Sequence, residues 1–174
     1  MIAEDDVAGI DTQNVSRWLV EHVAGAEAPF RFEIIAGGHS NLTYRVLSAD
    51  GTSFVLRRPP LGHVLASAHD MGREFRIISG LQESAVPVAP ALGSCDDATV
   101  NGAPFYVMGY VDGHVVRDRT VAEAALDVTA RTNASRSLVD TMAAIHAVDL
   151  EAAGLVDLAR HEGYIPRQLK RWYG

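Results

Sequence analysis

The pattern of apolar and polar positions in the first 60 residues predicts a helix followed by an antiparallel sheet. Residues 11–25 carry apolar side chains three and four positions apart, which is typical of an amphipathic helix. Alternating segments at 32–35 and 43–47 flank a glycine-rich turn and predict two paired strands. The dipeptide Asp50-Gly51 is a strong hairpin signal that leads into a third strand at 53–57.

The next 50 residues predict one helix and two further strands. The third strand should end at Pro59-Pro60, because proline has no amide hydrogen for the strand ladder. An apolar stripe over 69–82 predicts a second helix. Residues 91–95 can form a short strand, and Asn101-Gly102 predicts a hairpin turn before a nearly continuous apolar run at 104–111. We expect that run to be a buried strand.

After residue 113 the sequence has only helical signals. Residues 120–130 can be helical, and 134–148 have a clear helical period. The segment from 155 to 174 mixes basic and aromatic residues and is interpreted as a solvated or partner-facing helix. Strands with one intervening helix, followed by helices, predict an α+β fold with two lobes and a five-stranded antiparallel sheet.

The turn between the first two strands is the main candidate for chemistry. It contains adjacent glycines at Gly37 and Gly38, followed by His39, Ser40 and Asn41. Glycines let backbone amides approach an anion closely, and successive amides form an anion-binding concavity. Ser40 and Asn41 add side-chain donors. The alternative is an ordinary hairpin with a flexible loop, and the turn alone does not separate the two.

Composition and charge exclude several classes of function. The chain has 174 residues, 15 Lys and Arg against 22 Asp and Glu, and a net charge of -7. That charge argues against nucleic acid or an anionic membrane as the main partner. We find no apolar run long enough to span a bilayer and no basic signal peptide, and the single cysteine, Cys95, is compatible with a cytoplasmic protein. No histidine and cysteine spacing matches a zinc site, so no metal ligands are predicted.

Several motifs in order resemble the aminoglycoside phosphotransferase family, which has the protein-kinase-like fold. Within it, the sequence is most similar to the branch that includes the kinase-like domain fused to acyl-CoA dehydrogenases. The motifs are 37–44 (GGHSNLTY), 54–60 (FVLRRPP), 73–75 (REF), 106–113 (YVMGYVDG), 144–149 (AIHAVD) and 163–172 (GYIPRQLKRW). They cover almost the whole chain. The resemblance implies a nucleotide-binding N-terminal lobe over residues 1–112 and the start of a helical C-terminal lobe over 113–174.

The resemblance also implies roles for the residues in these motifs. Arg57 stands where most of the family has a lysine that holds the α- and β-phosphates of ATP, and a guanidinium can still grip phosphate and carboxylate together. Glu74 matches the helix glutamate that pairs with that cation. Met108 would line the adenine pocket, and the Gly109 carbonyl and Val111 amide would hydrogen-bond adenine. The turn residues implied to lie over the phosphates are Gly37, Gly38, His39, Ser40 and Asn41.

Each of these residues also has a purely structural interpretation. Arg57 and Arg58 could be solvated charges on an edge strand. Glu74 could pair with a neighbouring arginine at the surface, where an ion pair contributes little. Met108 could be part of the core.

The family's catalytic loop, of the His-Gly-Asp type, is absent from this sequence, so no catalytic residue is expected within these residues. Asp149 lies on a helix that precedes that loop in the family, with the wrong spacing for it. The resemblance implies that the loop and the Mg²⁺ ligands belong to a later part of the C-terminal lobe. The predicted function is therefore the ATP-binding portion of a small-molecule kinase acting on a hydroxylated substrate; in the dehydrogenase-fused branch a hydroxyacyl thioester is a plausible acceptor. The alternatives are a non-catalytic nucleotide-binding or interaction module, or a domain associated with acyl-CoA dehydrogenase function. A homo-oligomer could form through exposed apolar surface.

Overall fold

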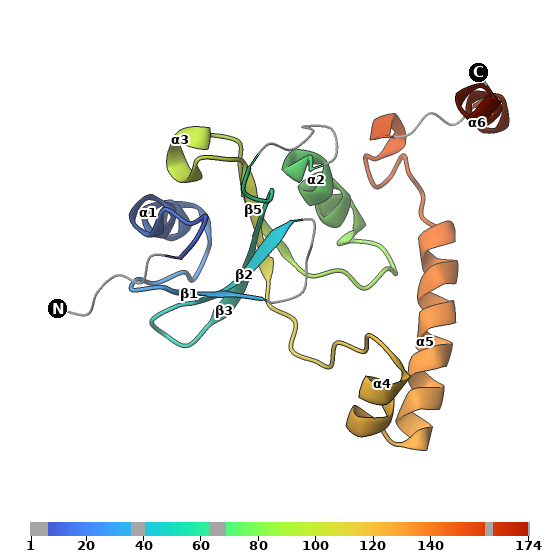
Figure 1. Ribbon diagram of the computed structural model, residues 1–174, viewed down its shortest axis with the longest axis horizontal. Helices are drawn as coiled ribbons and strands as arrows, with labels where there is room; N and C mark the ends of the chain where they lie inside the picture. Colours follow the sequence, from blue (N-terminus) through green and yellow to red (C-terminus); the bar gives the residue numbers. More distant parts are fainter. Residues whose placement is uncertain (1–6, 36–40, 63–68, 159–161, 174) are drawn as a thin grey trace.

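The computed structural model describes residues 7–35, 41–62, 69–158 and 162–173. A five-stranded antiparallel sheet lies between two helices, and further helices follow it along the chain (Figure 1). The strand order is β1-β2-β3-β5-β4, so β3 is the central strand. The strands are β1 (Arg31–Ile34), β2 (Leu42–Leu47), β3 (Ser53–Arg58), β4 (Ala91–Cys95) and β5 (Phe105–Gly109). The five strands expected from the sequence are confirmed.

One face of the sheet packs against helix α1 (Thr12–His22). Asp11 caps the helix by accepting a hydrogen bond from the amide of Asn14, and the apolar stripe of α1 is buried. Trp18 meets the ring of Phe105 edge to face, with the ring centroids 4.9 Å apart. A side chain at Gly93 would touch Trp18, so this glycine in β4 lets the indole lie directly on the sheet.

The other face of the sheet packs against helix α2 (Met71–Leu81). Successive side chains of a strand point to opposite faces, so Phe105 and Val107 join the core under α1 while Tyr106 points toward α2. Covering both faces explains why β5 is apolar without alternation. Arg57 of β3 pairs in register with Tyr106 and therefore shares the face under α2.

The connection between β4 and β5 differs from the expected hairpin. Asn101-Gly102 is the end of a one-turn helix, α3 (Ala98–Asn101), and Gly102 takes the left-handed conformation, with φ of 69°, that ends it. The two strands still pair antiparallel, with Cys95 opposite Phe105. The turn signal was correct in position but wrong in type, because Asp97 caps a helical turn before it.

The C-terminal part is helical, as expected. The helix expected at 120–130 is divided: α4 (Arg119–Ala125) ends before Asp127, which caps the long helix α5 (Val128–His146). A turn and the short 3-10 helix η2 (Val156–Leu158) lead to α6 (Tyr164–Tyr173). These helices leave large apolar side chains exposed, among them Leu138, Met142 and Ile145 on α5 and Ile165, Leu169 and Trp172 on α6. None of the helices in the described ranges combines the length and the hydropathy needed to cross a membrane.

Candidate functional site

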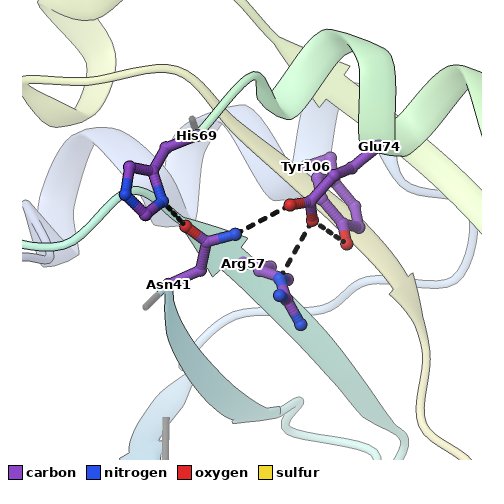
Figure 2. A network of polar contacts seen from close by, with 5 residues as sticks. All are labelled: Asn41, Arg57, His69, Glu74 and Tyr106. Atoms are coloured by element: carbon purple, nitrogen blue, oxygen red, sulfur yellow. Dashed lines mark hydrogen bonds and ion pairs between the residues drawn. The ribbon is translucent and has the colours of Figure 1, made fainter. Parts of the chain in front are cut away.

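Arg57 and Glu74 meet beneath α2. Arg57 Nε lies 3.0 Å from Glu74 Oε2, and the two side chains are 34% and 32% exposed. The Nε atom is itself buried and its N–H does not point at an acceptor, so the contact is an ion pair by distance without hydrogen-bond geometry. Figure 2 shows the two terminal nitrogens of Arg57 directed away from the carboxylate. The pair therefore fixes one side of the guanidinium and leaves its end to other partners.

Glu74 is the centre of a wider polar network. The hydroxyl of Tyr106 donates to Glu74 Oε2 at 3.1 Å, and the side-chain amide of Asn41 donates to Oε1 at 2.8 Å (Figure 2). Both carboxylate oxygens thus have a protein partner, in addition to the positive charge of Arg57. Residues of β3, β5 and α2, with Asn41 just before β2, therefore hold one carboxylate in place.

His69 completes the network on the side of Asn41. Its Nδ1 atom lies 2.6 Å from Asn41 Oδ1. Since the amide nitrogen of Asn41 donates to Glu74, its oxygen must accept, which requires His69 to carry a hydrogen on Nδ1. Asn41 is 5% exposed and uses both ends of its side chain inside the protein. Its side chain is thus engaged in positioning Glu74.

Burial raises the pKa of the Tyr106 phenol well above its usual value, and the negative charge of Glu74 adds to the shift, while Arg57 opposes it. Tyr106 is 2% exposed. The phenol therefore stays protonated at neutral pH and acts as a hydrogen-bond donor to Glu74.

Arg58 has a different role from Arg57. It is 7% exposed, and its guanidinium donates to the backbone carbonyls of Gly9 and Asn101, while Nε donates to that of Pro59. The interpretation of Arg57 and Arg58 as solvated charges on an edge strand is wrong, because β3 is central and both side chains have internal partners. Arg58 ties the N-terminal segment and α3 to the sheet.

The expected adenine-binding segment lies at the end of β5. Met108 pairs in register with Val55 and Ala91 and is partly buried. The amide of Gly109 donates to the carbonyl of Pro90 at 2.8 Å, so it is not free for a ligand. Val111 follows the strand and is 69% exposed. The proposed adenine contacts are the carbonyl of Gly109, at the end of β5, and the amide of Val111, just after it.

Four of the expected phosphate-binding residues, Gly37, Gly38, His39 and Ser40, lie outside the described residues. A hollow of about 290 Å³ lies between the end of α2 and residues 144–153, and Arg57 is not among the residues that line it. Within the described ranges, no three His, Cys, Asp or Glu residues cluster to hold a metal ion.

The comparison with family models decides the classification. The model of the phosphotransferase enzyme family matches residues 31–174. The chain belongs to the phosphotransferase enzyme family. A solved phosphotransferase-family relative from Ralstonia eutropha, provisionally assigned as an aminoglycoside phosphotransferase, has a TM-score of 0.77 and 31% identity over 94% of this chain. The α+β, protein-kinase-like fold predicted from the sequence is thereby confirmed.

The relatives of this chain confirm the predicted branch, because they are named as acyl-CoA dehydrogenase family proteins. "Acyl-CoA dehydrogenase family member 10" of Mus musculus is 38% identical over 78% of the chain. "Probable acyl-CoA dehydrogenase IBR3" of Arabidopsis thaliana is 33% identical over 94% of it. This phosphotransferase-family chain spans 12% and 20% of those two proteins, and 46% of the solved Ralstonia chain.

The sequence did not indicate two members of the network. In the sequence, Tyr106 is one position of the apolar run that predicts a buried strand, and His69 is the first residue of the predicted second helix. The available signal was that a tyrosine in a buried run needs a partner for its hydroxyl. His69 carried no comparable signal, because its partner Asn41 is 28 residues away.

Proposed function

We propose that this phosphotransferase-family chain is the ATP-binding portion of an enzyme that transfers the γ-phosphate of ATP to a hydroxyl group of a small molecule. The observation that carries the proposal is the Arg57–Glu74 pair. The buried Nε atom of Arg57 lies beside the Glu74 carboxylate, and the two terminal nitrogens of Arg57 are directed away from it (Figure 2). A guanidinium can bind phosphate oxygens with two parallel N–H groups. The residues present therefore fit a polyphosphate ligand.

Glu74 gives this cation a fixed orientation. A long arginine side chain loses rotamer freedom when it binds a ligand, and that loss weakens binding. The charge of Glu74 restricts Arg57 before any ligand arrives, and Glu74 is itself restricted by Tyr106 and Asn41. The network thus reduces the entropy cost of binding phosphate.

The remaining contacts of the proposed site come from the glycine-rich turn and from the end of β5. The turn residues Gly37, Gly38, His39, Ser40 and Asn41 would lie over the phosphates, in the manner of other anion-binding turns. At the end of β5, Met108 would line the adenine pocket. The Gly109 carbonyl and the Val111 amide would hydrogen-bond the base, and Val111 lies on the exposed segment that follows the strand.

We infer that the groups that carry out the transfer lie outside these residues. The sequence has no His-Gly-Asp loop, and the described residues offer no cluster of metal ligands. Mg²⁺, which neutralises charge on the transferring phosphate in such enzymes, would arrive with the nucleotide. We therefore expect the 174-residue chain to bind Mg²⁺-ATP without transferring phosphate.

Calorimetric titration with Mg²⁺-ATP tests the binding proposal. Arg57→Ala removes a charge-assisted contact that contributes about 1.5–3 kcal/mol, so the affinity should fall about tenfold or more. Arg31→Ala is the matched control, since Arg31 is an exposed arginine on the edge strand β1 that pairs with Glu33. Absence of binding by the unaltered chain, or equal binding by Arg57→Ala, would contradict the proposal.

A second candidate function is a non-catalytic nucleotide-binding or interaction module, or a domain associated with acyl-CoA dehydrogenase function. It is favoured by the names of the relatives, which describe acyl-CoA dehydrogenases. For the complete protein, transfer of labelled phosphate from ATP to a hydroxyacyl thioester separates the two. Transfer supports the kinase, and binding without transfer by the complete protein supports the module.

A further inference from the structure

Helix α2 is held on two opposite sides. Glu74 faces the sheet and contacts Arg57, Tyr106 and Asn41. Arg76 and Gly80 are about one helical turn apart, so they share a face of α2. Glu74 is two positions from Arg76, so its side chain points to the opposite side of the helix. The face of Arg76 and Gly80 is covered by residues 149–158, which follow α5 and which we call the 149–158 turn.

The first contact of this face is a two-pronged ion pair. Nη1 of Arg76 donates to Asp157 Oδ2 at 2.7 Å, and Nη2 donates to Asp157 Oδ1 and to the carbonyl of Gly154. The guanidinium therefore binds one carboxylate with two parallel N–H groups and a backbone carbonyl in addition. This geometry fixes the direction of the contact as well as its distance.

The second contact is between backbones. A Cβ atom at Gly80 would collide with the carbonyl oxygen of Ala153 and would lie 3.1 Å from Leu155 Cδ2. Leu155 is 7% exposed, so its side chain is buried against this region. The 149–158 turn thus lies directly on α2, at a distance that only glycine permits.

The turn is itself a well-bonded structure. The amide of Ala153 donates to the Asp149 carbonyl at 3.0 Å, and that of Leu155 donates to the Leu150 carbonyl at 2.9 Å. The carboxylate of Asp149 accepts from the amides of Glu151 and Ala152. The turn can therefore transmit the position of the C-terminal end of α5 to α2.

We propose that Arg76, Gly80 and Asp157 are positioning residues, which dock α2 on the 149–158 turn so that Glu74 stays on Arg57. This inference rests on the proposed nucleotide site. Rotation or sliding of α2 would move Glu74 relative to the central strand, and Arg57 would lose the partner that restricts it. The C-terminal helices thereby contribute to phosphate binding without touching the ligand.

Affinity for Mg²⁺-ATP tests the proposal in the 174-residue chain. Arg76→Ala and Asp157→Ala should each weaken binding by about threefold to fivefold, as for the loss of one exposed ion pair. The charge swap Arg76→Asp with Asp157→Arg should recover most of the affinity. Arg73→Ala is the matched control, because Arg73 is an exposed arginine on the same helix whose side chain has no partner among the described residues.

A spectroscopic readout separates positioning from a simple loss of stability. The Nε–H resonance of Arg57, identified by its absence in Arg57→Lys, should shift or broaden in Arg76→Ala and in Gly80→Ala without nucleotide. A merely structural contact would lower the unfolding temperature and leave both that resonance and the affinity unchanged, which would overturn the proposal. If the unaltered chain does not bind Mg²⁺-ATP, the proposed function fails, and the Arg57 resonance still decides whether the turn positions Glu74.

Discussion

Gly109 and Pro90 lock the end of β5 to the segment before β4. The Gly109 amide donates to the Pro90 carbonyl at 2.8 Å, and a Cβ atom on Gly109 would lie 2.9 Å from Pro90 Cδ. The proline ring is rigid, so it cannot move aside as the end of a flexible side chain would. Only glycine lets the strand end come this close, at the point where the chain leaves the sheet for the C-terminal helices.

Gly109→Ala should therefore destabilise the protein. Overpacking of this kind typically costs about 1–3 kcal/mol, and urea denaturation should show a lower midpoint. Gly113→Ala is the matched control, since a Cβ atom on Gly113 would have no neighbour within 4 Å among the described residues, and this variant should unfold as the unaltered protein does. Equal urea midpoints for the two variants would contradict this prediction, because they would show that Pro90 moves aside without loss of stability.

Tyr106→Phe removes the hydroxyl that donates to Glu74 and keeps the buried ring. We expect a loss of about 1 kcal/mol in the free energy of unfolding, since a net hydrogen bond contributes roughly that much. Tyr110→Phe is the control, because the ring of Tyr110 contacts Arg45 and its hydroxyl has no hydrogen-bond partner in the described ranges. A Tyr106→Phe variant as stable as the control would mean that Glu74 does not depend on this phenol.

Alkaline pH should destabilise the fold through two buried phenols. Burial raises the pKa of Tyr44 and Tyr106 above 10.0, although Arg58 partly opposes the shift for Tyr44. A group whose pKa is raised in the folded state makes its full contribution to stability below its unfolded-state pKa. That contribution is lost as the pH rises from the unfolded-state pKa through the folded-state pKa. Stability should thus begin to fall above about pH 10. Tyrosinate absorbance recorded with circular dichroism checks this: full ionisation of all five tyrosines while the fold is intact would contradict it.

The pKa of Asp157 reports on the docking of α2. Hydrogen bonds from Arg76 lower the pKa of this carboxyl below 3.8 and raise that of Arg76. Arg76→Ala should return the pKa of Asp157 toward 3.8, measured by carbon-13 NMR of the carboxyl group. Since the folded-state pKa is lowered, the contribution of the pair is present above pH 3.8 and is lost as the pH falls through the folded-state value. An unchanged titration in Arg76→Ala would show that the pair does not persist in solution.

Exposed apolar side chains on α5 should promote self-association. Leu138, Met142 and Ile145 recur at helical spacing and are 65%, 52% and 50% exposed. We expect the sedimentation coefficient to increase with protein concentration, and Met142→Glu should reduce that increase. Val20→Glu is the control, since Val20 on α1 is similarly exposed at 52% and lies apart from this face. A monomer at all concentrations would contradict the prediction.

The sequence by itself determined the elements and their order. Hairpin and helix signals are local, so Asp50-Gly51, the apolar stripe of α2 and the apolar run of β5 were sufficient to predict a five-stranded α+β sheet with its helices. The motifs also indicated the family and paired Arg57 with Glu74 in advance. The division of the helix expected at 120–130 and the turn of α3 were missed because Asp97 and Asp127 act as caps, and a cap is weak evidence until the following amides are in place.

The tertiary structure alone decided which side chains share a face and which lie in contact across the chain. Tyr106 and Asn41 reach Glu74 because β2, β3 and β5 lie side by side, and strand order cannot be deduced from spacing in the sequence. Arg76 and Asp157 are 81 residues apart, and their contact depends on the path of every element between them. Local patterns fix local conformation, but contacts between distant segments depend on how the whole chain packs.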